Sequence, residues 1–82
     1  MVDQPTLTKV IELFSTMTAV SAENINEESE LMEDLEISSM DVLFLISSLE
    51  EEFHISVPEK GIRKMVTVGD VVAVVTALMQ KS

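Results

Sequence analysis

Apolar residues recur at helical spacing in three separate stretches of the chain. In the first stretch they follow the i, i+3, i+4, i+7 pattern, at Leu7, Val10, Ile11, Phe14 and Met17. Pro5 suits the first turn of a helix, where its missing N–H costs no intrahelical bond. The pattern predicts an amphipathic helix over about residues 5–19.

The second stretch begins with two helix-start signals that agree. Ser38 precedes it and Asp41 follows three residues later, so the Ser38 hydroxyl can accept a hydrogen bond from the Asp41 N–H, while the Asp41 carboxylate reaches back to the N–H of residue 38. Ile37 and Val42 can pack together as a hydrophobic staple. The apolar face that follows is Val42, Leu45, Ile46, Leu49 and Phe53. We predict a helix over 39–53 whose apolar face packs against the first helix.

Between and after these two stretches the pattern is irregular. Residues 21–33 are polar and acidic, which predicts a long loop lying over the bundle. Its apolar anchors are Ile25, Leu31 and Met32. Pro58 disfavours the helical conformation at the residue before it, so residues 54–58 break the helix after Phe53. Residues 59–65 can form only a short helix, which Gly61 weakens.

A third helical stretch closes the chain. Thr67 and Asp70 repeat the capping-box pattern at its start. The apolar positions behind them are Val68, Val71, Val72, Val75, Leu78 and Met79. Because valine has poor helix propensity, packing must hold this helix in place. Together the stretches predict one all-α domain over residues 1–82, a small four-helix bundle with three main helices and one short helix.

Charge narrows the possible partners. The net charge is −10, and residues 23–59 hold twelve of the fifteen acidic residues without any Lys or Arg. Nucleic acids and anionic membrane surfaces would repel such a chain, so we expect neither nucleic-acid binding nor stable membrane association. Basic partners are the natural inference, although an acidic face can also serve solubility alone.

Features that the sequence lacks set the remaining expectations. No apolar stretch is long enough to cross a bilayer, and the N-terminus lacks a basic region followed by an apolar run, so we expect a cytoplasmic protein. We also expect a monomer. The chain has no Cys, which excludes disulfides and thiolate metal sites. The acids over 27–34 lack the alternating oxygen ligands and the Gly of a calcium loop, so no specific metal site is expected.

Ser39 is the main candidate for chemistry. It occupies the first position of the second predicted helix, where its hydroxyl faces solvent and free backbone N–H groups favour nearby negative charge. A phosphate attached there would be well placed, although Ser39 can also be read as one more small polar residue at a helix start. A serine is a poor nucleophile without an adjacent base, and the only histidine, His54, has no such arrangement. We therefore predict that the chain is not an enzyme.

The sequence around Ser39 resembles that of acyl carrier proteins near the serine that carries 4′-phosphopantetheine. The matching segments are 31–41 (LMEDLEISSMD), 49–53 (LEEEF), 57–59 (VPE) and 66–70 (VTVGD), which together span most of the chain. By this match Ser39 is the attachment serine. The chain departs from the family at three positions, with Glu36 in place of the usual Gly, Ser38 in place of Asp and Met40 in place of Leu.

The resemblance implies that the chain carries acyl groups and does not itself catalyse a reaction. A phosphopantetheinyl transferase would move 4′-phosphopantetheine from coenzyme A onto Ser39, and acyl groups would travel as thioesters on this arm between the separate enzymes of fatty acid or polyketide-type biosynthesis. The helices could also enclose a growing chain, with Met17, Met65 and Met79 repacking around it, although methionine at helical spacing also suits a plain core. Two alternatives remain: a carrier for aminoacyl or D-alanyl groups, and an unmodified acidic interaction module with the same fold.

The second predicted helix also offers a docking surface for enzymes with basic surfaces. At 100° per residue, Met40, Phe44 and Glu51 lie opposite the buried face, and Leu43 lies at its boundary. We expect acidic residues to steer the partner and apolar residues to be buried on contact, so that the surface comprises Asp41, Glu50, Glu51, Met40, Leu43 and Phe44. The alternative is that Phe44 packs locally under the long loop.

Overall fold

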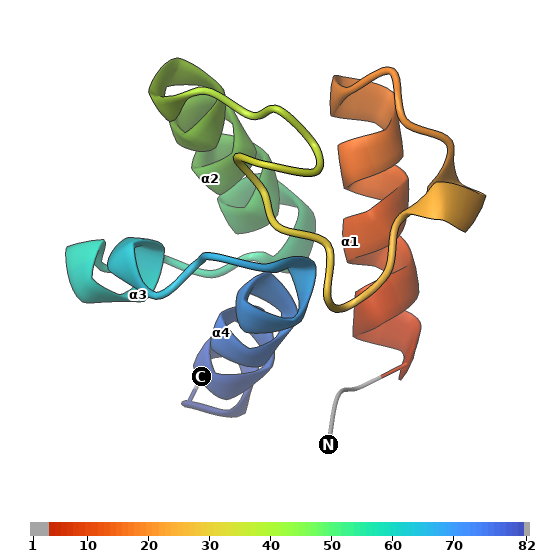
Figure 1. Cartoon of the computed structure of the whole chain (residues 1–82). Coiled ribbons are helices and arrows are strands. Elements are labelled where there is room, and N and C mark those ends of the chain that lie inside the picture. The colour runs from red at the N-terminus through yellow and green to blue at the C-terminus, as the bar shows by residue number, and fades with distance from the viewer. Residues whose placement is uncertain (1–3, 82) are drawn as a thin grey trace.

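The computed structural model describes residues 4–81 and has four α-helices and one short 3₁₀ helix (Figure 1). The elements, in chain order, are α1 (Gln4–Met17), η1 (Ala22–Asn24), α2 (Ser39–Phe53), α3 (Glu59–Arg63) and α4 (Val68–Lys81). The predicted all-α bundle of three main helices and one short helix is confirmed. Helix α1 ends two residues earlier than expected, because the Thr18 hydroxyl donates to the Phe14 carbonyl at 2.8 Å and accepts from the Val20 N–H at 3.2 Å.

The core lies between α1, α2 and α4. Its fully buried side chains include Val10, Phe14, Leu45, Leu49, Val68, Val71, Val72 and Val75. Helix α1 packs mainly against α4, and its recorded polar link to α2 is peripheral, with Lys9 3.7 Å from Glu52. The predicted apolar face of α2 lies in the core that α1 also lines, because Leu45, Ile46 and Leu49 belong to the same buried cluster as Val10 and Phe14. The valines of α4 at positions 68, 71, 72 and 75 are buried in that cluster as well. That burial offsets the poor helix propensity of the valines.

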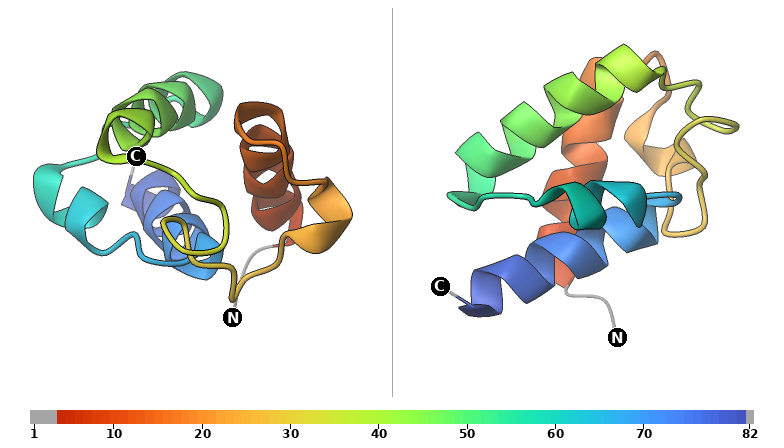
Figure 2. Two further views of the ribbon diagram at one scale, coloured as in Figure 1. Left: turned by 45° about the horizontal axis from the view of Figure 1, so that its top comes forward. Right: turned by 90° about the vertical axis from the view of Figure 1, so that its left-hand side faces the viewer.

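Helix α3 is short and lies close to α4. Gly61 is buried, and a Cβ built there would meet the Cγ1 atom of Val74 at 3.3 Å, so glycine allows the close approach. Arg63 ends the helix two residues before the predicted boundary. From the side shown on the right of Figure 2, α3 lies between α2 above and α4 below, so the three helices share one face of the molecule.

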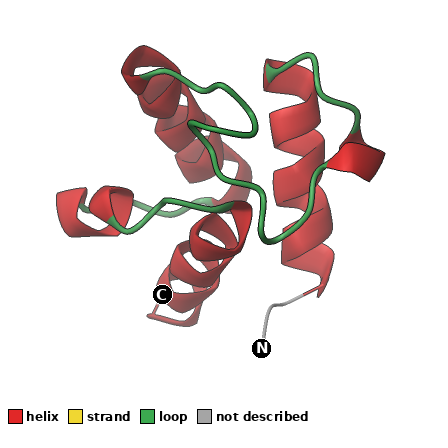
Figure 3. Ribbon diagram, viewed as in Figure 1, coloured by secondary structure: helices red, strands yellow, loops and turns green. Residues whose placement is uncertain are grey.

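The long loop between α1 and α2 crosses the bundle and is tied to the α3–α4 connection (Figure 3). Leu31 N–H donates to the Val66 carbonyl at 3.0 Å, and Val68 N–H donates to the Ser29 carbonyl at 2.9 Å. Buried anchors fix the loop at Ile25, Leu31, Leu35 and Ile37. Met32 was expected among them but is 62% exposed, because Leu31 takes the inward position beside it. Within residues 4–81 no helix is both long and apolar enough to span a bilayer.

Candidate functional site

The start of α2 has the predicted capping box. Asp41 N–H donates to the Ser38 hydroxyl oxygen at 3.3 Å, and Ser38 N–H donates to the Asp41 carboxylate at 3.1 Å. The Ser38 hydroxyl also donates to that carboxylate at 3.0 Å, so Ser38 Oγ is engaged as donor and as acceptor. Ile37 before the cap is buried and Val42 packs against the core, as the staple requires. These contacts fix the direction in which the loop enters α2.

Ser39 differs from its neighbour in having a free hydroxyl. It is exposed, it occupies the first position of α2, and its side chain makes no hydrogen bond to any residue in the described part of the chain. The backbone N–H groups at this end of a helix carry partial positive charge, which favours a bound phosphate. The residue therefore fits attachment of a phosphate-linked group.

A pocket of about 550 Å³ opens beside Ser39, between the long loop, the start of α2 and the segment from α3 to α4. Its walls are largely apolar, and Glu30, Glu33 and Arg63 are its exposed charged members. The remaining lining residues are Leu31, Met32, Ser39, Val42, Leu43, Ile62, Met65 and Val66. An apolar chain attached through Ser39 could lie within reach of these walls.

The apolar residues predicted for docking are strongly exposed. Met40 is 80% exposed, Leu43 69% and Phe44 64%. Phe44 therefore does not pack under the long loop, and Leu43, which was expected at the boundary of the buried face, is on the surface. Such an apolar group beside acidic residues is unusual on an isolated small domain.

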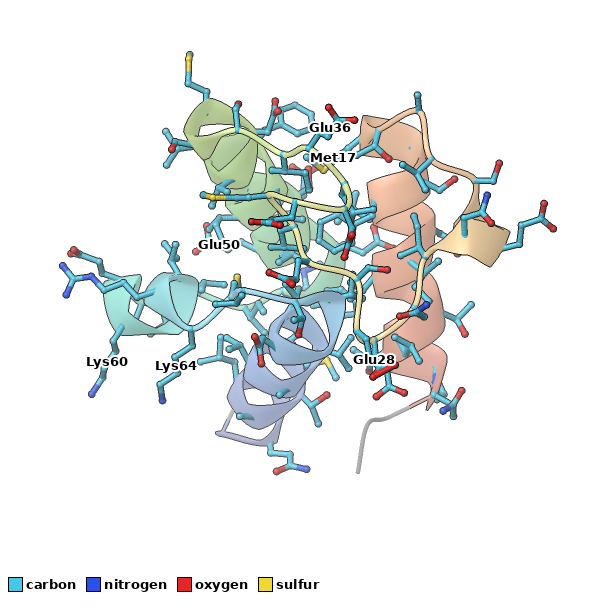
Figure 4. The ribbon with its side chains drawn as sticks, viewed as in Figure 1. Met17, Glu28, Glu36, Glu50, Lys60 and Lys64 are labelled. Atoms are coloured by element: carbon cyan, nitrogen blue, oxygen red, sulfur yellow. The ribbon has the colours of Figure 1, made fainter. Side chains whose placement is uncertain are left out.

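The three acidic residues predicted for docking are placed differently from one another. Glu51 is exposed, and Asp41 is exposed although its carboxylate belongs to the capping box. Glu50 is half-buried, and its Oε2 atom accepts a hydrogen bond from the Val57 N–H at 2.8 Å (Figure 4). Glu50 therefore holds the chain after α2, a role that periodicity did not reveal, because the donor lies seven residues away beyond the end of the helix.

Two non-glycine residues have a left-handed backbone conformation. His54 ends α2 with φ 55° and is exposed, which agrees with its predicted place on the surface. Glu36 has φ 53° in the loop before α2, at the position where the resemblance leads one to expect Gly. An L-residue in this region costs roughly 1–2 kcal/mol, so Glu36 carries strain that glycine would not.

The methionines named for repacking are spread over different parts of the bundle. Met65 lines the Ser39 pocket, Met17 lines a second pocket of about 310 Å³ beside Glu36 and Asp41, and Met79 packs against the core. Figure 4 shows Met17 and Glu36 close together near the ends of α1 and the loop. In the described residues no group of three or more His, Asp or Glu side chains is placed to hold a metal ion.

Sequence comparisons place the chain among known carriers. The profile of the family described as "Phosphopantetheine attachment site" matches residues 8–75. The chain is 47% identical to the acyl carrier protein of Wolinella succinogenes over 53 residues, which cover 65% of this chain and 70% of that protein. It is 38% identical to the acyl carrier protein of Clostridium acetobutylicum over 69 residues, which cover 84% of this chain and 90% of that protein.

Comparisons with solved structures find the same fold in acyl carrier proteins. The crystal structure of an acyl carrier protein from Thermotoga maritima superposes with a TM-score of 0.77 at 27% identity, covering 92% of this chain and 87% of that one. An acyl carrier protein from Enterococcus faecalis superposes with a TM-score of 0.80 at 24% identity, covering 95% of this chain and 99% of that one. Because the family profile spans most of the chain and the similar proteins are acyl carrier proteins, the chain belongs to the acyl carrier proteins of the phosphopantetheine attachment family.

Proposed function

We propose that Ser39 is the residue that carries 4′-phosphopantetheine, and that the chain presents acyl thioesters on this arm to the separate enzymes of fatty acid or polyketide-type biosynthesis in the cytoplasm. Acyl carrier proteins are non-catalytic carriers, and the family implies a phosphopantetheinyl transferase and biosynthetic enzymes as partners. The observation that carries the proposal is the free, exposed Ser39 hydroxyl at the start of α2, beside an apolar pocket.

The contrast between the two adjacent serines supports Ser39 over Ser38. The Ser38 hydroxyl donates to the Asp41 carboxylate and accepts from the Asp41 N–H, so modifying it would break the capping box. Loss of an N-cap typically costs about 1 kcal/mol of stability. Modification of Ser39 breaks no hydrogen bond of the described residues, so the fold tolerates the arm there.

The attachment step leaves the protein with a phosphodiester. The Ser39 hydroxyl oxygen would form a bond to the pantetheine-side phosphorus of the diphosphate that joins the two halves of coenzyme A. The bond from that phosphorus to the bridging oxygen would break, 3′,5′-ADP would leave with that oxygen, and the hydroxyl proton would pass to a base of the transferase. The arm then supplies a thiol for thioester chemistry, while Ser39 and α2 supply attachment and presentation.

Partner enzymes are proposed to dock on the outer surface of α2. Glu51 and Asp41 are exposed and can steer a basic surface toward the arm, while Met40, Leu43 and Phe44 can be buried once contact forms. Glu50 was expected to act in steering as well, but one oxygen of its carboxylate is engaged with Val57 N–H. We therefore assign Glu51 the larger share of steering.

Peptide mapping tests the assignment of the attachment serine. The protein is incubated with coenzyme A and a phosphopantetheinyl transferase, then digested and sequenced by tandem mass spectrometry. We expect the group on Ser39, and a group found on Ser38 contradicts the assignment. Loading the holo protein with acyl and aminoacyl donors in competition then separates an acyl carrier from an aminoacyl or D-alanyl carrier.

A further inference from the structure

The side chains of this protein that oxidise readily are almost all methionines. The chain has no Cys, Trp or Tyr, one His and six Met, so its sulfur atoms are all methionine thioethers. Hydroperoxides oxidise a thioether to the sulfoxide, and methionine sulfoxide reductases reverse the reaction. The exposure of each thioether therefore decides which part of the molecule an oxidant changes first.

The structure divides the methionines into two groups. Met40 is 80% exposed and Met32 is 62% exposed, whereas Met65 is buried and Met17 and Met79 are half-buried against the core. The remaining methionine, at position 1, lies outside the described residues. At a limited dose, an oxidant should react with the exposed pair and leave the core methionines reduced.

Both exposed methionines lie beside Ser39. Met40 is the next residue of α2, and Met32 lines the pocket that Ser39 also lines. On a helix a side chain is next to those three and four positions further on, so Met40 adjoins the exposed Leu43 and Phe44. Oxidation of Met40 would therefore place a sulfoxide oxygen in the apolar group proposed for docking, at its Ser39 end.

We propose that Met40 is a site of reversible oxidation, and that its sulfoxide slows the loading of Ser39 without unfolding the protein. The inference rests on the proposed function of Ser39. The Met40 sulfur gives an electron pair to one oxygen of a hydroperoxide, and the new sulfur–oxygen bond forms as the peroxide O–O bond breaks. The proton of the transferred oxygen passes to the second oxygen, which leaves as water or as an alcohol.

The effect on loading follows from the polarity of the product. A transferase that brings coenzyme A to the Ser39 hydroxyl must cover the residue next to it. The sulfoxide is polar and accepts hydrogen bonds, so a surface that buries the apolar Met40 side chain has no donor aimed at the new oxygen. Burial of that unpaired oxygen weakens the complex.

The fold tolerates the change because Met40 contributes little to it. Its side chain lies mostly in water. The capping box at the start of α2 is made by Ser38 and Asp41 and uses no atom of Met40. The sulfoxide therefore alters the docking surface and leaves the start of α2 in place.

The test oxidises the unloaded protein, which has no thiol because the arm is absent and the chain has no Cys. The protein is treated with hydrogen peroxide at increasing doses, the peroxide is removed, and peptide mapping gives the oxidised fraction of each methionine. The rate of loading from coenzyme A by a phosphopantetheinyl transferase is then measured as kcat/KM. Circular dichroism and melting curves confirm that the oxidised protein is folded.

The expected result has three parts. Met40 should be oxidised before Met17, Met65 and Met79. The loading rate should fall on the order of 3- to 10-fold as the Met40 sulfoxide accumulates, and the two reductases that act on the two sulfoxide epimers should together restore it. The proposal is overturned by an unchanged rate for folded protein with Met40 fully oxidised, or by slower oxidation of Met40 than of the half-buried methionines.

Two single variants assign the effect to one methionine. The rate of each variant after oxidation is divided by its own rate before oxidation, so that a change in the starting rate does not enter the comparison. Met40→Leu cannot form a sulfoxide and should keep its rate, whereas Met32→Leu should slow as the wild type does. A Met40→Leu protein that slows as much as the wild type would also overturn the proposal.

Failure of this inference can be told apart from failure of the proposed function. An unoxidised wild-type protein that is never loaded would overturn both the function of Ser39 and the inference that rests on it. An unoxidised protein that is loaded, together with an oxidised protein loaded equally well, would overturn only the role of Met40.

Discussion

Glu50 and Glu51 are neighbours on α2, and the structure gives them different roles: Glu50 stabilises the fold, and Glu51 remains available for docking. The Oε2 atom of Glu50 accepts a hydrogen bond from the N–H of the buried residue Val57 at 2.8 Å. Hydrogen bonds to a charged group contribute roughly 1.5–3 kcal/mol, and their loss leaves a buried donor unpaired. Replacing Glu50 with Ala should therefore destabilise the protein through the segment that follows α2.

Two effects oppose this loss. Glu50 lies in the last turns of α2, where the helix dipole disfavours negative charge by roughly 0.3–1 kcal/mol, and the protein already has a net charge of −10. Glu51 shares both features but is exposed, and no hydrogen bond or ion pair is recorded for its side chain in the described part of the chain. Glu51→Ala is therefore a matched control that removes the same charge from the same part of the same helix.

The assay is urea unfolding followed by circular dichroism at 222 nm. We expect Glu50→Ala to lower the free energy of unfolding by about 1–2 kcal/mol, which corresponds to about 5–15 °C in Tm for a domain of this size. Glu51→Ala should be neutral or slightly stabilising, and Glu50→Gln, which keeps an acceptor oxygen, should recover part of the loss. Equal free energies of unfolding for the two Ala variants would refute the structural role of Glu50.

Three further predictions follow from single features of the structure. Glu36→Gly should raise the free energy of unfolding by about 0.5–1 kcal/mol, because glycine removes the strain of the left-handed φ of 53° and loses only part of that gain to chain entropy. Glu33→Gly, at a residue without positive φ, should lower the free energy of unfolding in the same urea assay. Melting temperature should rise between low and moderate sodium chloride, because screening weakens repulsion among acids that are mostly unpaired, and a flat or falling Tm contradicts this. Phe44→Ala should mainly hasten dissociation from partner enzymes, weakening the free energy of binding by about 1–3 kcal/mol, while Glu51→Lys should mainly slow association. Normal transfer kinetics for a folded Phe44→Ala protein would remove Phe44 from the docking surface.

Local signals predicted the parts of the structure that depend on neighbouring residues. The capping boxes at Ser38 and Thr67 lie where spacing placed them, since each needs only residues three positions apart. Exposure of Met40 and Phe44 followed from the helical period.

Features that join distant segments were not predicted. The pocket beside Ser39 combines the long loop, α2 and the segment from α3 to α4, and no periodicity connects Ile62 or Val66 with Ser39. Leu31 is buried and Met32 is exposed because the Leu31 N–H donates to the Val66 carbonyl and so fixes the orientation of the loop. Two adjacent apolar residues in the sequence do not indicate which of them is buried. Arg63 is visible in the sequence as a basic residue, but its place in the wall of the Ser39 pocket required the fold.

The most direct test of the central claim is the intact mass of the protein after incubation with coenzyme A and a phosphopantetheinyl transferase. We expect the wild type to gain the mass of one 4′-phosphopantetheinyl group, and Ser39→Ala to remain folded and gain nothing. Ser38→Ala serves as the control, because it should be less stable by about 1 kcal/mol through loss of the cap and yet still gain one group. An unmodified wild-type protein, or a Ser39→Ala protein that gains the group, contradicts the assignment of Ser39 as the attachment site.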